Sequence, residues 1–210
     1  MLHESPSPET IFGYLSTIQS LEHGYFGGYL IVSVLGRPLE FHCTAPVRPS
    51  RALEILYGPT LEPYLLGEQI SGTLLGAAKL TPRLILTDQS PALYVRSKIG
   101  VPMVLVLGRA EDQNPSITRN NVPAASEFAS TIDSYIEDKP SNSGDHDFTA
   151  GSYKLQLPCG YEGEEPLIAE LLTIFAQHVD LAEPFDRIHE AIREAQRIGG
   201  RGNEGHGQAA

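Results

Sequence analysis

Two short and almost wholly apolar runs constrain the fold of this chain most strongly. They are Leu84-Ile-Leu-Thr87 and Met103-Val-Leu-Val-Leu107, and such runs are typical of strands buried on both faces of a sheet. Between them, Ser90-Pro91 opens a predicted short helix over 92–99, which Gly100 ends. A strand, a crossover helix and a second strand predict a parallel pair, and therefore an α/β (or α+β) domain with helices covering a mixed sheet.

The segment before this pair predicts an N-terminal helix and a β-hairpin. Apolar residues recur at helical spacing over 8–23, after Ser7 and Pro8, which suit a helix start. Two β-rich runs, 29–34 and 39–44, are joined by a short loop with a glycine, as in a hairpin. Alternation along the second run predicts a core face made of Leu39, Phe41 and Cys43. The opposite face, toward solvent or a site, then carries Glu40, His42 and Thr44.

Composition shifts divide the rest of the chain. Residues 109–151 are rich in Asn, Ser, Asp and Pro and mostly lack apolar periodicity, so we expect a disordered acidic insertion there. Order returns with an alternating strand at 153–157 and an amphipathic helical pair at 165–179 and 184–198. The expected organisation is an α/β core at 1–108, the insertion at 109–151, a strand and two helices completing the same domain at 152–198, and a disordered tail at 199–210.

The charge balance bears on the choice of partner. The 210 residues carry a formal net charge of −11, with Lys+Arg 15 against Asp+Glu 26. Most of the excess lies in the second half, and such a surface repels phosphate backbones and anionic lipid. We therefore expect neither nucleic acid nor a membrane as partner. The start of the chain has no secretory pattern and the two cysteines suit reduced thiols, which together predict a cytoplasmic location.

Four residues are candidates for a catalytic site. Asp88 and Ser90 follow a buried strand, at the place where ligands sit in open α/β sheets. The alternative for these two is an ordinary turn, with Ser90 capping the next helix. Glu40 and His42 share one strand face and could complete such a crevice, although an exposed imidazole is the simpler interpretation of His42.

Metal and cofactor motifs are incomplete in this sequence. His189 and Glu190 lack the second histidine of a zinc protease, and His189 falls on the polar side of the last predicted helix. Cys159 has no second cysteine within four residues. No glycine-rich phosphate loop precedes a helix. We accordingly predict no metal site and no cofactor.

Two resemblances to known proteins accompany these patterns. The element order over 8–107 is similar to that of the cytidine-deaminase-like fold, but Ala45-Pro-Val47 and Ser90-Pro-Ala-Leu93 stand where that family carries its zinc motifs. Zinc-dependent deamination is therefore contradicted. The block 36–58 resembles short uncharacterised bacterial proteins, and this resemblance implies no activity.

These observations leave two functions open. The first is an intracellular protein-binding or regulatory module without its own catalysis, which suits the acidic insertion. The alternative is a small hydrolase-like enzyme with its site at the carboxyl end of the strand 84–87, near Asp88 and His42. Whether the chain is an enzyme, and its oligomeric state, are not decided by the sequence.

Overall fold

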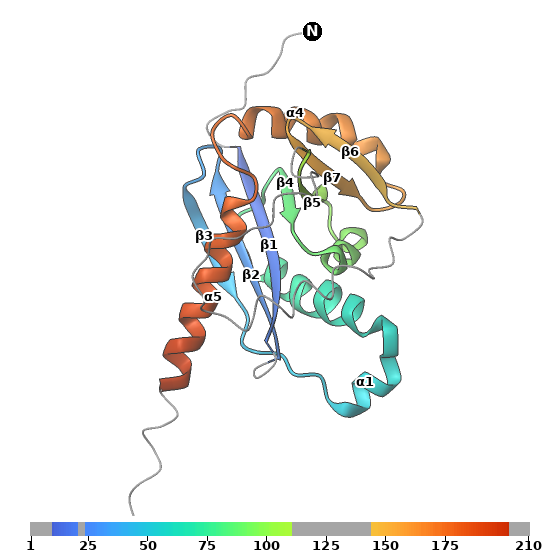
Figure 1. Ribbon diagram of the computed structural model, residues 1–210, viewed down its shortest axis with the longest axis vertical. Helices are drawn as coiled ribbons and strands as arrows, with labels where there is room; N and C mark the ends of the chain where they lie inside the picture. The colour runs from blue at the N-terminus through green and yellow to red at the C-terminus, as the bar shows by residue number, and fades with distance from the viewer. Residues whose placement is uncertain (1–9, 21–23, 111–143, 202–210) are drawn as a thin grey trace, which may run out of the picture.

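The computed structural model describes residues 10–20, 24–110 and 144–201, which form a sheet covered by helices on both faces (Figure 1). The strands are β1 (Ile11–Ser20), β2 (Gly24–Ser33), β3 (Pro38–Cys43), β4 (Leu84–Thr87), β5 (Met103–Arg109), β6 (His146–Ala150) and β7 (Tyr153–Leu157). The longer helical elements are α1 (Arg51–Tyr57), η2 (Pro63–Ser71), α2 (Gly72–Ala77), η3 (Ser90–Lys98), α4 (Glu165–Phe175) and α5 (Glu183–Arg201). The predicted α/β class with a mixed sheet is confirmed.

The order of the strands in the sheet is β3-β2-β1-β4-β5-β7-β6. β1, β4 and β5 are parallel to one another, which confirms the predicted parallel pair, and the remaining neighbours are antiparallel. From β1 the chain proceeds to β2 and β3 on one side of the sheet, whereas from β4 it proceeds to β5 on the other. The strand order therefore reverses between β1 and β4.

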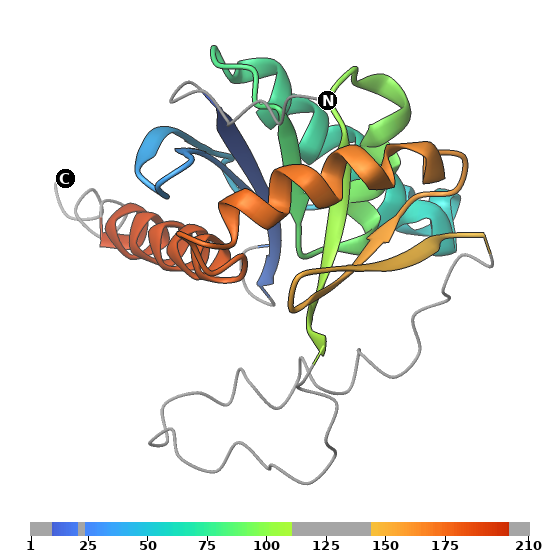
Figure 2. The same ribbon diagram turned by 90° about the horizontal axis from the view of Figure 1, so that it is seen from above.

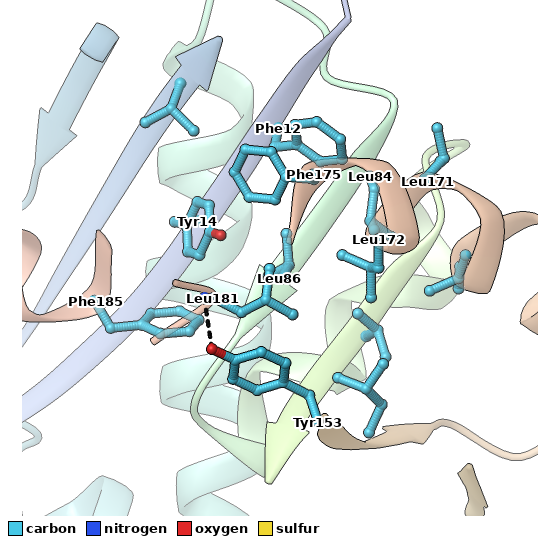
Figure 3. Packing of buried hydrophobic residues seen from close by; sticks show 14 of the residues in the cluster. Phe12, Tyr14, Leu84, Leu86, Tyr153, Leu171, Leu172, Phe175, Leu181 and Phe185 are labelled. Carbon is cyan, nitrogen blue, oxygen red and sulfur yellow. Dashed lines mark hydrogen bonds between the residues drawn. The ribbon is translucent and has the colours of Figure 1, made fainter. Parts of the chain in front are cut away.

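Helices lie on both faces of the sheet (Figure 2). A layer of apolar side chains fills the space between the sheet and the helices on each face. On one face, α4 and α5 cover side chains of β1, β4 and β7, and the rings of Phe12 and Phe175 stack with centroids 4.0 Å apart (Figure 3). On the other face, η2, α2 and η3 cover Leu15, Tyr29 and Ile85. Because both faces are covered, the central strands are apolar on both sides, as their continuous runs predicted.

The predicted N-terminal helix over 8–23 is wrong, because residues 11–20 form β1 at the centre of the sheet. The helical spacing of apolar residues there arises from a strand that is buried on both faces from Phe12 to Thr17. Such a strand shows no alternation, so periodicity does not separate it from a buried helix.

The predicted hairpin forms, but its second strand presents the opposite face to the core. Leu39 and Phe41 are 49% and 39% exposed, and Cys43 is exposed as well, so the prediction of a core cysteine is wrong. Phe41 pairs with Leu30 and so lies on the α5 side of the sheet. β3 is an edge strand, and α5 packs mainly on its neighbours β2 and β1.

Both ends of the predicted disordered insertion 109–151 belong to strands of the sheet. β5 ends at Arg109, and β6 spans His146–Ala150. Residues 111–143 of the insertion lie outside the described part of the chain, as do 202–210 of the predicted tail. α5 continues to Arg201, beyond the helix end predicted at 198. The division of the chain into domains stays a prediction. No helix in the described ranges is long and apolar enough to cross a bilayer.

Candidate functional site

The candidate site lies where the strand order reverses, beside the carboxyl end of β4. Asp88 follows the last residue of β4, and the parallel register that pairs Leu15 with Thr87 sets Asp88 beside Ser16 of β1. Both side chains point to the face covered by α5, since Leu86 and Tyr14, two residues earlier on their strands, belong to that layer. Ligands of open α/β sheets bind at such positions.

α5 completes the site because it comes very close to the backbone of the sheet. Gly28 of β2 is the register partner of Ser16. A Cβ atom on Gly28 would lie 2.4 Å from Cγ2 of Ile188 and 3.1 Å from Cδ1 of Ile192. The glycine therefore allows this turn of α5 to sit directly on β2, and it places His189 over Ser16.

Three side chains meet at this point. The Oγ atom of Ser16 lies 3.0 Å from Oδ2 of Asp88 and 2.8 Å from Nε2 of His189. The same Nε2 atom lies 3.3 Å from Oδ2 of Asp88. Asp88 and His189 lie 72 and 173 residues from Ser16 in the chain, so the fold brings the three side chains together.

The positions of the protons follow from the chemistry of the three groups. A carboxylate only accepts hydrogen bonds, and a serine hydroxyl has one proton to donate. Ser16 therefore donates to Asp88, and its oxygen accepts the Nε2–H of His189. This arrangement leaves the second ring nitrogen of His189, Nδ1, without a proton in the neutral imidazole.

Exposure differs among the three residues. Ser16 is fully buried, whereas the side chains of Asp88 and His189 are 21% and 25% exposed. Oδ1 of Asp88 is buried without a hydrogen-bond partner among the described residues. Nδ1 of His189 is not among the buried unpartnered atoms, and no hydrogen bond to it is found in the described ranges. We infer that this nitrogen faces solvent and can accept a proton from a ligand or a water molecule.

The structure does not bring the four predicted candidates into one crevice. Glu40 and His42 pair with each other, with 2.7 Å between Oε1 and Nε2. His42 is the register partner of Tyr29, whose ring belongs to the layer under η2 and α2. It therefore lies on the opposite face of the sheet from Asp88, with β2 and β1 between them. Ser90 begins η3 and makes no hydrogen bond to the cluster in the described structure.

The sequence therefore named Asp88 as a candidate at the end of the strand 84–87, but it did not indicate Ser16 and His189 as its partners. His189 was assigned to the polar side of its helix, but it is half-buried against the sheet. A signal for Ser16 exists in the sequence, since it is a polar residue in an apolar run. That signal has meaning only once 11–20 is known to be a strand.

The described residues contain no cluster of three or more His, Cys, Asp or Glu side chains with the arrangement of metal ligands. Asp88 and His189 are two such residues, and Ser16 completes the cluster with a hydroxyl. An imidazole held beside a carboxylate is an arrangement that can move a proton to or from a bound molecule.

Comparisons with known proteins identify neither a family nor a named function. No protein-family model and no curated protein matches the sequence. Two solved structures of endonuclease V from Ciona intestinalis are similar to this chain, at 11% sequence identity. One, a variant in complex with a 23-mer DNA containing an inosine, has a TM-score of 0.34 and covers 77% of this chain and 76% of its own. The other, with a 24-mer DNA, has a TM-score of 0.37 and covers 90% of this chain and 87% of its own.

These neighbours correct one expectation from the sequence. Both are complexes with DNA, so the exclusion of nucleic acid as a partner is contradicted. The exclusion was drawn from the net charge of the chain and from its excess in the second half, whereas binding depends on the local charge of one surface. A likeness of this degree assigns no ligand to the present chain.

Proposed function

We propose that this protein is a hydrolase in which His189 acts as the general base that activates a water molecule. One observation carries the proposal: Ser16, Asp88 and His189 meet within hydrogen-bond distance at the reversal of the strand order. A carboxylate near one imidazole nitrogen, with the other nitrogen open to solvent, is an arrangement typical of general acid–base catalysis.

The reaction follows from the proton positions. Nδ1 of His189 takes a proton from water while the water oxygen bonds to the electrophilic carbon or phosphorus of the substrate. The imidazolium that forms is stabilised by the carboxylate of Asp88, 3.3 Å from Nε2. As the bond to the leaving group breaks, His189 returns the proton from Nδ1 to that group. The imidazole is then neutral again.

Ser16 is a positioning residue in this proposal. It is fully buried, so its oxygen is not accessible to a substrate. It donates its one proton to Asp88, so it has no proton to give to the histidine. Its contacts set the distance between the other two side chains and keep the Nε2–H of His189 in place. The proposed base thus depends on a residue that the substrate does not touch.

The test measures hydrolysis by the full-length chain and by three variants. The substrates are 4-nitrophenyl acetate, bis(4-nitrophenyl) phosphate and an inosine-containing DNA. We expect turnover of one substrate class and a loss of about 10²–10⁴-fold in kcat for His189→Gln, because the amide can still donate to Ser16 but cannot act as a base. Asp88→Asn, which removes the charge and replaces one acceptor oxygen by a donor NH2 group, should lower kcat as well.

The matched control is His178→Gln, since His178 is an exposed histidine outside the cluster. It should retain the turnover of the unsubstituted chain. Equal turnover in His189→Gln and the control would refute the proposal, as would the absence of turnover in every substrate class. The protein-binding module without catalysis stays a prediction that these assays would then favour.

A further inference from the structure

A pocket of about 530 Å³ lies on the face of the sheet opposite to the proposed catalytic site. Its walls come from the connection between β3 and α1, residues 44–50, and from the helices η2 and α2. Small-molecule sites commonly have volumes of about 300–1,000 Å³. The pocket is therefore large enough for a small organic ligand, and it is independent of the proposed hydrolase function.

The pocket walls are mostly apolar. Leu65, Ile70 and Leu74 contribute from η2 and α2, and Val47 and Leu53 contribute from the opposite side. Among the described residues that line the pocket, none is Asp or Glu, and Arg48 is the one side chain with a permanent charge. A ligand here gains most of its affinity from buried apolar surface.

His42 provides a polar anchor at the pocket wall. Behind it, the carboxylate of Glu40 accepts hydrogen bonds from the backbone N–H groups of Lys79, at 2.9 Å, and Leu80, at 3.0 Å. Glu40 also contacts Nε2 of His42 at 2.7 Å. Because a carboxylate only accepts, the ring of His42 must carry a proton on Nε2. The bonds that hold Glu40, first that from His42, lower the pKa of this carboxyl to about 2.

The remaining ring nitrogen of His42 determines which ligand group fits. Nδ1 accepts a hydrogen bond in the neutral ring and donates one in the imidazolium. A hydroxyl group can pair with either form, because it both donates and accepts. The hydroxyls of Thr44 and Thr73 already take part in hydrogen bonds, with the N–H of Gly27 at 2.9 Å and the carbonyl of Gln69 at 2.6 Å.

We propose that this pocket binds an uncharged, mostly apolar molecule whose hydroxyl group pairs with Nδ1 of His42. The ligand class follows from the mostly apolar walls, from His42 as an adaptable polar anchor and from the Glu40 carboxylate behind that anchor. Arg48 in the lining already takes part in another interaction, and the carboxylate of Glu40 directly behind His42 would repel an anionic ligand at this anchor. A hydrocarbon would leave the anchor unused.

The test titrates the full-length chain with 2-naphthol, 2-methoxynaphthalene and 2-naphthoate. The chain has no tryptophan, so naphthalene fluorescence reports binding directly. The first two probes share a ring system and differ in the O–H donor, and the third replaces the hydroxyl with a charge. We expect 2-naphthol to bind about 3–10-fold more tightly than 2-methoxynaphthalene, the effect of one hydrogen bond. We expect 2-naphthoate to bind more weakly than 2-naphthol.

Two variants locate the binding event. His42→Phe keeps a ring in place and removes Nδ1, so it should reduce 2-naphthol affinity to that of 2-methoxynaphthalene. Ala77→Phe, at an exposed lining position, should weaken both neutral probes. Equal binding of the two neutral probes, tighter binding of 2-naphthoate, full binding by Ala77→Phe or no binding at all would each overturn the proposal.

Discussion

The Gly28→Ala variant tests how the packing of α5 positions the proposed catalytic site. The added methyl would lie 2.4 Å from Cγ2 of Ile188, whereas ordinary contact begins at 3.4 Å. Ile188 is fully buried and β-branched on a helix, so it cannot rotate away easily. We therefore expect this part of α5 to move outward by about 1 Å.

The magnitude follows from this displacement. Overpacking of a core costs about 1–3 kcal/mol, and replacement of a strand glycine by alanine restricts the unfolded chain and offsets about 0.4–1 kcal/mol of that cost. A net loss of about 1–2 kcal/mol remains. A shift of about 1 Å along the contact would lengthen the 2.8 Å distance between His189 and Ser16 beyond hydrogen-bond range. Hydrolytic turnover should then decrease even under conditions in which the variant remains folded.

Gly27→Ala is the matched control, because Gly27 neighbours Gly28 but faces η2. Its Cβ atom would lie 2.2 Å from Cγ2 of Ile70, so urea denaturation should show a similar loss of stability. Nuclear magnetic resonance of the His189 ring should change in Gly28→Ala and stay unchanged in Gly27→Ala. Equal effects of both variants on the His189 ring, or no loss of stability in Gly28→Ala, would show that Gly28 does not set the position of α5.

Three further predictions concern stability, each measured by chemical denaturation. Phe175→Ala should cost about 3–5 kcal/mol, because the ring is fully buried and stacks on Phe12; a loss below about 1 kcal/mol would contradict the described core. Arg96→Met should cost an amount near the lower end of about 3–5 kcal/mol, because it leaves the partly buried carboxylate of Glu164 without its cation; an unchanged midpoint would contradict this. Since the pKa of Glu40 is lowered from 4.5 to about 2, its stabilisation is present above pH 4.5 and is lost as the pH falls through 2. Glu40→Gln should therefore lose less stability than the unsubstituted chain over that acid range, and an identical acid dependence would count against the pairing.

The sequence predicted those elements whose pattern has one structural meaning. The runs 84–87 and 103–107 are too short for helices and too apolar for loops, and they form β4 and β5 in a parallel pair. The run at 11–20 has two meanings, since a strand covered on both faces lacks alternation. β3 alternates as predicted, yet only the packing of α5 and η2 on its neighbours decides which of its faces is buried.

The site shows the same limit more sharply. Asp88 was predicted from its place after a strand, a local property of the chain. Its partnership with Ser16 depends on the register of β1 against β4, and its contact with His189 depends on the approach of α5 to Gly28. Glu40 and His42 lie on the same face of one strand, which local alternation predicts. That the sheet separates them from Asp88 depends on how the strands are arranged in the sheet. Long-range register and helix packing are not encoded in local spacing.

The most direct measurement is the position of the proton on the ring of His189, read from ¹⁵N chemical shifts of the imidazole at a pH where the ring is neutral. We expect the proton on Nε2, held by Ser16 and Asp88, with Nδ1 unprotonated and available as a base. In Ser16→Ala this preference should weaken, while the exposed His178 provides the internal reference. A proton on Nδ1 of His189, or tautomers averaged as in His178, would contradict the role of His189 as the general base.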